Sequence, residues 1–179
     1  LTGAAFAKTL AWTLKIKTIG VNHLEAHIFS AMMTEPNLKF PFLSLLVSGG
    51  HTFLSIVKDH GKYEIIGRTL DDSAGEAFDK IARQLGLNYP GGPEISKSAS
   101  ETNITAFNFP RPMIKSGDYN FSFSGLKTHV NNAIKKTKLT EKIISEIALD
   151  FENAISDVLI HKTLKLSLIH ISEPTRLGM

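Results

Sequence analysis

The stretch FPFLSLLVSGGHTFLSIVKDHGKYEIIGRTLDDSAGEAFDKIARQLG, residues 40–86, decides the fold. Within it, Phe40–Val47 is an apolar run that ends at a glycine pair, and Thr52–Val57 and Tyr63–Leu70 flank a turn. Three consecutive strands in a meander are the simplest interpretation. Residues 73–86 then repeat apolar side chains at helical spacing. Strands followed by helices predict a mixed α/β fold.

The helix expected over 73–86 carries a signal at each end. Ser73 and Glu76 form a capping box, and Gly86 is a stop signal. Its apolar stripe is centred near Phe78, so Asp79 would lie on one flank, where it could border a cleft beside Gly75. Glu76 and Lys80 are expected to form an i,i+4 surface pair.

Before the meander, the spacing predicts a helix over residues 3–14, a short strand over Lys15–Val21 and a second helix from Asn22 to about Met33. Asn22 is its expected N-cap. This second helix is apolar nearly all round, which predicts that it is buried.

After the meander, residues 88–116 are expected to be mostly loop, with one short helix at Pro93–Glu101. A helix capped by Ser124 should run to about Lys136, and another from Thr140 to about Lys165. The tail at 167–179 changes character and resembles a translated adapter sequence, so we expect it to be non-native.

Composition limits the function classes. The chain has 179 residues, no cysteine and a formal charge of +3. The absence of cysteine excludes a disulfide framework, cysteine-ligated zinc and a thiol nucleophile, and the small charge names no partner by itself. No apolar run approaches the roughly 20 residues of a membrane span, which favours a cytoplasmic location and no membrane partner.

Two histidines form the first candidate site. His23 and His27 lie one helical turn apart on one face, the spacing at which two imidazoles can share a metal ion. Two partner-bonded structural histidines are about equally consistent with the pattern. Glu25 falls about 200° away from His23 around the helix, so a zinc-protease arrangement is disfavoured.

The glycine pair forms the second candidate site. Gly49 and Gly50 join two strands through a turn whose amides could approach a phosphate or carboxylate, although such a pair is usually only a hairpin turn. The stretch Pro90–Pro93 is a stiff, glycine-containing loop against which an anionic or flat ligand could lie. Lysines in the second half could contact RNA phosphates, but they more often form a solvated face.

Taken in order, five motifs closely resemble the tRNA N6-adenosine threonylcarbamoyltransferase family, formerly described as O-sialoglycoprotein endopeptidases. They are VNHLEAH at 21–27, LVSGGHT at 46–52, DDSAGEAFDK at 71–80, YPGGP at 89–93 and FSFSGLK at 121–127. The form resembles bacterial members, or a mitochondrial relative. The likeness runs from about Gly3 to Leu166.

The resemblance implies an actin/Hsp70/sugar-kinase-like (ASKHA) fold, here an incomplete two-lobed fragment. Residues 1–39 would end the first lobe, and residues 40–166 would begin the second. The implied reaction transfers threonylcarbamoyl from threonylcarbamoyl-AMP to N6 of adenosine 37 in tRNAs that read codons beginning with A. Accessory protein subunits of the modification machinery are implied partners, and a mitochondrial matrix location is the alternative to the cytoplasm.

The resemblance also implies roles for residues. The metal ligands, for one divalent ion such as Fe²⁺ or Zn²⁺, would be His23 and His27. The adenylate-binding positions would be Leu46, Val47, Ser48, Gly49, Gly50, Asp79 and Gly92. His51 is a candidate acid or base.

The chain departs from the family pattern because it lacks the opening strands, a later substrate-binding Asn and the terminal Asp ligand. We therefore expect no turnover from it alone. Two other functions stay open, a metal-dependent glycoprotein endopeptidase and a non-catalytic ASKHA-fold assembly subunit. In the transferase interpretation, His23 and His27 face the same crevice as the Ser48–Gly50 amides.

Overall fold

A computed structural model describes residues 2–170, with the side chains of residues 169 and 170 left undescribed. The chain divides into two compact units, Leu1–Leu38 and Lys39–Met179. The assignment of residues 1–39 and 40–166 to two lobes stays a prediction. The prediction of a non-native tail falls mostly on residues 171–179, outside the described residues, and it stays a prediction.

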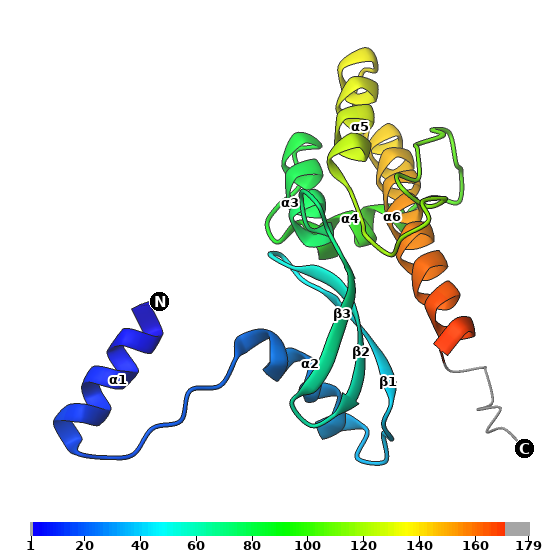
Figure 1. Cartoon of the computed structure of the whole chain (residues 1–179). Coiled ribbons are helices and arrows are strands. Elements are labelled where there is room, and N and C mark those ends of the chain that lie inside the picture. The colour runs from blue at the N-terminus through cyan, green and yellow to red at the C-terminus, as the bar shows by residue number, and fades with distance from the viewer. Residues whose placement is uncertain (1, 171–179) are drawn as a thin grey trace, which may run out of the picture. The chain divides into compact units, whose positions relative to one another are not determined.

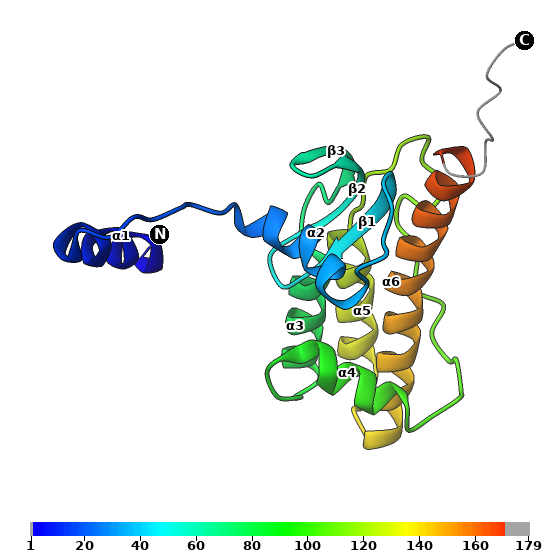
Figure 2. The ribbon, with the colours of Figure 1, turned by 90° about the horizontal axis from the view of Figure 1, so that it is seen from below.

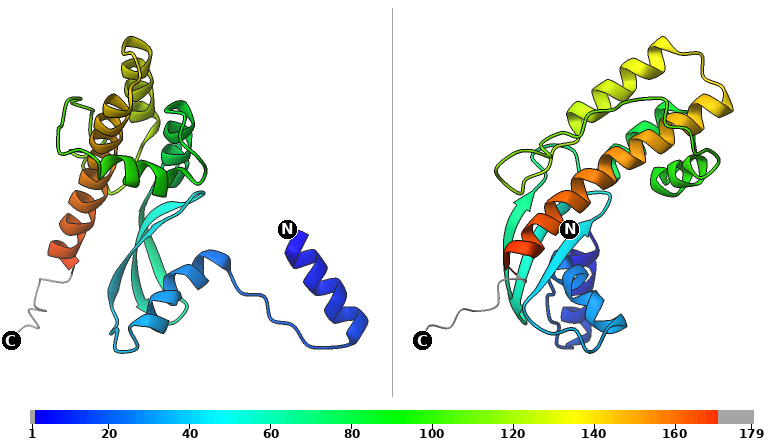
Figure 3. Two further views of the ribbon diagram at one scale, coloured as in Figure 1. Left: turned by 180° about the vertical axis from the view of Figure 1, so that it is seen from behind. Right: turned by 90° about the vertical axis from the view of Figure 1, so that its right-hand side faces the viewer.

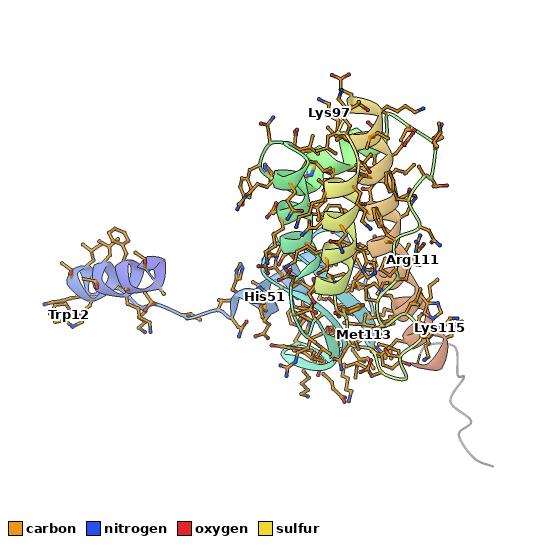
Figure 4. All side chains as sticks on the ribbon, turned by 90° about the horizontal axis from the view of Figure 1, so that it is seen from above. Trp12, His51, Lys97, Arg111, Met113 and Lys115 are labelled. Carbon is orange, nitrogen blue, oxygen red and sulfur yellow. The ribbon has the colours of Figure 1, made fainter. Side chains whose placement is uncertain are left out.

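The first unit contains two helices, α1 (Thr2–Leu14) and α2 (His23–Thr34), shown in blue in Figure 1. Asn22 caps α2 as expected, because its side chain accepts the amide hydrogens of Leu24 and Glu25 at 2.9 and 3.2 Å. The aromatic side chain of Trp12, labelled in Figure 4, is 84% exposed.

Two expectations for this unit are wrong. The strand expected over Lys15–Val21 does not form: these residues pair with no strand, and the described sheet is built from residues 42–68 alone. Most side chains of α2 are not buried. Among the described residues of this unit, the buried hydrophobic ones are Ala11 and Ile28, too few to form a core that would cover an apolar helix.

The second unit opens with the expected meander. Strands β1 (Phe42–Val47), β2 (Thr52–Asp59) and β3 (Lys62–Arg68) pair antiparallel in the order β1-β2-β3 (Figure 1). The central strand β2 is buried at six successive positions, from Thr52 to Val57. Alternation is absent there because both faces of β2 are covered.

Four helices follow: α3 (Ala74–Gln84), α4 (Gly91–Ala99), α5 (Ser124–Lys136) and α6 (Glu141–His170). Figure 2 shows α3, α5 and α6 side by side with α4 across one end, and α4 packs against both α3 and α6. The long helix α6 extends beyond the expected end at Lys165 (Figure 3). Its buried side chains join those of α3 and α5 in one core.

The start of α5 differs from the expectation, because Ser124 is its first residue and not its cap. The capping group is the carboxylate of Asp71, more than fifty residues earlier. It accepts the amide hydrogen of Phe123 at 2.8 Å and the hydroxyls of Ser122 and Ser124 at 2.6 and 2.7 Å. Partial burial raises the pKa of Asp71, but these hydrogen bonds outweigh it and hold the pKa below its ordinary value.

A buried lysine fixes the loop before α5. Lys162 of α6 is 1% exposed, and its ammonium group donates to the Ser116 hydroxyl at 2.8 Å and the Asn120 carbonyl at 2.6 Å. Burial lowers the pKa of Lys162. Across residues 2–170, we find no helix with the length and apolar character needed to cross a membrane.

Candidate functional site

The turn between β1 and β2 is fastened to the start of α3 by three hydrogen bonds. The Gly75 amide donates to the Ser48 carbonyl at 3.2 Å, and the Ser73 hydroxyl donates to the Gly49 carbonyl at 2.7 Å. The Ala74 amide donates to the Thr52 hydroxyl at 2.9 Å. The cap of α3 therefore also sets the position of the glycine turn.

Gly75 is required for this close approach. A Cβ atom there would meet the Ser48 carbonyl oxygen, lie 2.7 Å from the Ser48 carbonyl carbon and lie 2.8 Å from the Gly49 Cα. All three contacts are with backbone, which cannot rotate away. Gly75 and Asp79 both line the pocket as expected, but the space that a side chain would fill at Gly75 is taken by the backbone of the turn and is not left open beside Asp79.

Gly49 and Gly50 differ from Gly75 because the fold does not require them. Neither has a positive φ, and a Cβ atom at either position would meet nothing within 4 Å. Gly92 is equally open. Because these glycines have no side chain, the space in front of their backbone is free, and a ligand can approach it closely.

Two amides of the turn are free to bind such a ligand. The turn is closed by the Ser48 amide, which donates to the His51 carbonyl at 2.8 Å, and by the His51 amide, which donates to the Ser48 hydroxyl at 3.1 Å. Within residues 2–170, the amides of Gly49 and Gly50 donate no hydrogen bond. Adjacent exposed amides of this kind suit an anion.

A pocket of about 450 Å³ lies beside the turn, of the size that small-molecule ligands occupy. Its walls come from the β1–β2 turn, α3, the loop before α4 and α6. The lining residues are Val47, Ser48, Gly49, Gly75, Phe78, Asp79, Tyr89, Pro90, Gly92 and Glu152.

Asp79 has a structural role in this pocket as well as a place on its wall. Its Oδ1 accepts the Gly91 amide hydrogen at 2.8 Å at the start of α4. A Cβ atom on Gly91 would lie 2.7 Å from the Asp79 Cα, so α4 can approach α3 this closely only with glycine there. Asp79 thereby positions Gly92, whose amide lies in the unbonded first turn of α4.

The structure brings together most of the adenylate-binding positions implied by the resemblance, namely Val47, Ser48, Gly49, Asp79 and Gly92. Two others, Leu46 and Gly50, do not line the pocket, and neither does His51, the candidate acid or base. Leu46 is buried in the sheet, Gly50 is exposed beside the pocket, and His51, labelled in Figure 4, has an exposed side chain. The proposed acid or base role of His51 stays a prediction.

Pro90, in the loop that the sequence marked as a ligand surface, lines the pocket. Sequence reasoning missed three pocket residues, Phe78, Tyr89 and Glu152. Phe78 had been assigned to the apolar stripe of α3, and Tyr89 adjoins the glycine loop that marked this region. Glu152 carried no motif. Its position at the pocket depends on how α6 is rotated about its own axis, which is set by tertiary packing.

The two histidines form a separate site in the first unit. Their Nε2 atoms are 3.2 Å apart, and their rings meet edge to face with centroids 4.5 Å apart. Two nitrogens at about 2.0–2.1 Å from one metal ion would be roughly 2.9–3.4 Å apart at octahedral or tetrahedral angles. The pair therefore fits two ligands of one ion, and it equally fits one hydrogen bond.

The described residues supply no complete metal site. No group of three or more His, Cys, Asp or Glu side chains converges within residues 2–170. His23 and His27 would contribute two ligands, so further ligands would have to come from other groups.

Several charged side chains of the second unit form ion pairs with one another. Lys80 contacts Glu76 at 2.7 Å, which confirms the expected i,i+4 pair, and it also contacts Asp72 at 2.8 Å. Lys127 lies 2.6 Å from the other Asp72 oxygen. Partial burial raises the pKa of Asp72, but hydrogen bonds from Lys127 and Lys80 outweigh it and lower that pKa overall. Two cations from the basic second half, Lys127 and Arg111, are thus engaged in ion pairs.

Comparison with known proteins identifies the family. The model of the tRNA N6-adenosine threonylcarbamoyltransferase family matches residues 1–178. The chain belongs to this family. Relatives bearing that name include a Thermosipho melanesiensis protein, 53% identical over 165 residues, and a Desulfitobacterium hafniense protein, 49% identical over 177 residues. A third, from Clostridioides difficile, is 48% identical over 167 residues.

The matches cover nearly all of this chain but half of each relative. They span 92% of the chain against 50% of the Thermosipho threonylcarbamoyltransferase, and 98% against 52% of the Desulfitobacterium one. The chain therefore spans about half the length of the threonylcarbamoyltransferases it matches. The recognition made from the five ordered motifs is confirmed at the level of the family.

Proposed function

We propose that the protein to which this chain contributes transfers a threonylcarbamoyl group from threonylcarbamoyl-AMP to N6 of adenosine 37 in tRNA. Within it, the pocket of the second unit holds the adenylate. The observation that carries this proposal is the combination of the unbonded Gly49 and Gly50 amides with a pocket of about 450 Å³ lined by two aromatic side chains.

The pocket suits the parts of an adenylate. Its phosphate would accept hydrogen bonds from the Gly49 and Gly50 amides, and from the amide of Gly92 at the positive end of α4. The adenine ring would lie against Tyr89, which is 81% exposed although it is aromatic. An exposed aromatic ring at a pocket mouth offers a base a stacking surface.

The proposed reaction is an acyl transfer. The N6 amine of the tRNA adenosine forms a bond to the carbamoyl carbon, the bond from that carbon to the phosphate oxygen breaks, the amine loses a proton, and AMP leaves. Fixed amides that bind the phosphate stabilise the negative charge that grows on the leaving group. The glycine turn needs no rearrangement for this, because Ser73 and Gly75 already fasten it to α3.

A divalent metal ion, Fe²⁺ or Zn²⁺, fits the two imidazoles, and we propose that His23 and His27 contribute two of its ligands. When bound, it would polarise a phosphoryl or carbonyl oxygen. A site with two imidazoles is an incomplete ligand set for a tightly held ion. We therefore propose that the 179-residue chain alone has no transferase turnover.

We further propose that the second unit is part of an ASKHA-fold lobe and that accessory subunits join the assembly. The three antiparallel strands followed by helices are consistent with such a lobe. The expectation that the histidine pair and the glycine turn share one crevice stays a prediction.

The proposal is tested with a full-length protein containing this sequence, partner subunits, threonylcarbamoyl-AMP labelled in the threonyl group, and unmodified tRNA. Label should appear in adenosine 37 of the tRNA, and a tRNA with guanosine at position 37 should take up none. Unlabelled tRNA in the presence of all components would refute the proposal. Chelator-sensitive cleavage of a glycoprotein by the same preparation would favour the endopeptidase alternative.

A further inference from the structure

The further inference concerns Glu152, a pocket residue to which no role is assigned above. It comes from α6, far in sequence from the glycine motifs, and it is half-buried on the pocket wall. Its neighbour Phe151 is fully buried and packs edge to face against Phe78, with ring centroids 5.0 Å apart. Because successive helical residues differ by about 100°, burial of Phe151 fixes the direction in which Glu152 leaves α6.

The carboxylate of Glu152 has no donor from the chain. Across residues 2–170, no hydrogen bond or ion pair to it is formed. Three other carboxylates of this unit do have donors: Asp71 receives hydroxyls, Asp72 receives two lysines, and Asp150 receives two amides. Glu94, which is also half-buried, has none among residues 2–170, but it does not line this pocket. A carboxylate on a pocket wall whose oxygens accept nothing from the chain can accept hydrogen bonds from a ligand.

The pocket therefore has two chemically different parts. The turn presents amide donors, which attract an anion, and α6 presents an acceptor with negative charge, which repels an anion and attracts hydroxyl or amine hydrogens. Asp79 is the other carboxylate of the pocket, but its Oδ1 is already occupied by the Gly91 amide. Glu152 has both oxygens free for two adjacent donors.

We propose that Glu152 receives the two ribose hydroxyls of the bound nucleotide and thereby sets its direction in the pocket, with the phosphate at the glycine turn. The inference rests on the proposed function and deepens it. It makes Glu152 a residue that selects ribonucleotides over nucleotides without hydroxyls. Two hydrogen bonds to a carboxylate provide about tenfold or greater discrimination.

The test is calorimetric titration of the 179-residue chain with AMP and with 2′,3′-dideoxy-AMP, for wild type, Glu152→Gln and Glu152→Ala. Glu141→Gln is the matched control, because Glu141 is on the same helix and does not line this pocket. Circular dichroism spectra establish that each variant is folded. Wild type and the Glu141 variant should bind AMP about tenfold or more tightly than the dideoxy compound.

Glu152→Ala should bind both nucleotides equally, at the wild-type affinity for the dideoxy compound, with Glu152→Gln intermediate. A purely structural role would lower both affinities together, and that result would overturn the inference. Undiminished discrimination in Glu152→Ala would also overturn it, while leaving nucleotide binding intact. No AMP binding by folded wild-type chain would instead refute the proposed function of the pocket, and the inference with it.

Discussion

Replacing Gly75 by alanine should destabilise the second unit, although alanine is ordinarily the better helix residue. The added Cβ would meet the Ser48 carbonyl oxygen, lie 2.7 Å from the Ser48 carbonyl carbon and lie 2.8 Å from the Gly49 Cα. All three atoms belong to the turn that Ser73 and Gly75 hold. Helix α3 and the turn would therefore have to separate.

The expected magnitude follows from two contributions. Overpacking against backbone costs about 1–3 kcal/mol, and weakening of the Gly75 amide bond to Ser48 costs about 0.5–1.5 kcal/mol. The higher helix propensity of alanine offsets at most about 1 kcal/mol. The free energy of unfolding should fall by roughly 1–3 kcal/mol, which lowers the urea midpoint by about 1 M.

The assay is urea unfolding followed by circular dichroism, with Gly49→Ala as the matched control. A Cβ at Gly49 would meet nothing within 4 Å, so this control should change stability by less than about 0.5 kcal/mol. It should nonetheless weaken AMP binding, because the new methyl group occupies the space before the free amide. Equal stability of Gly75→Ala and wild type, with a destabilised Gly49→Ala, would refute this interpretation of the turn.

Three further predictions address other parts of the chain. Asp71→Ala should lower the free energy of unfolding by about 1–2 kcal/mol at pH 7, measured by urea unfolding, because α5 loses its cap. The folded pKa of Asp71 lies below its ordinary 3.8, so this stabilisation is present above about pH 4 and is lost as pH falls through the folded pKa. Wild type and variant should therefore have the same stability in acid, and a difference that does not change with pH would contradict the cap. Zn²⁺ should bind the chain with a stoichiometry of one by calorimetry, and His23→Ala or His27→Ala should each weaken binding at least about tenfold, whereas unchanged binding in both would show that the 3.2 Å contact is only a hydrogen bond. Tyr89→Ala should weaken AMP binding about tenfold while Tyr89→Phe retains it, since stacking needs the ring and not the hydroxyl; equal loss in both would exclude stacking.

The meander and α3 could be predicted because their signals are local. The apolar runs, the glycine turn, the Ser73 cap and the Gly86 stop, with a φ of +76°, all lie within residues 40–86. The register of the β1–β2 pair, with Val47 opposite Thr52, follows from the short turn itself. The local signals thereby place Gly49 in the turn between β1 and β2, and the hydrogen bonds to Ser73 and Gly75 place that turn at the pocket.

The errors arise where a distant group decides the local structure. Residues 15–21 have the composition of a strand, but among the described residues they pair with no strand of the sheet. Serine is a preferred N-cap residue, which suggested Ser124, but the carboxylate of Asp71 supplies the capping oxygens from another segment. Glu152 reaches the pocket because Phe151 packs on Phe78, a contact that the spacing of α6 residues does not reveal.

The central claim is that the bare amides of the glycine turn hold the phosphate of an adenylate. The most direct measurement is a ¹H–¹⁵N spectrum of the chain titrated with AMP and, separately, with adenosine. AMP should shift the amide resonances of Gly49, Gly50 and Gly92, and adenosine should leave the Gly49 and Gly50 resonances nearly unmoved. If AMP leaves these glycine resonances unchanged, or shifts them no more than adenosine does, the account is contradicted.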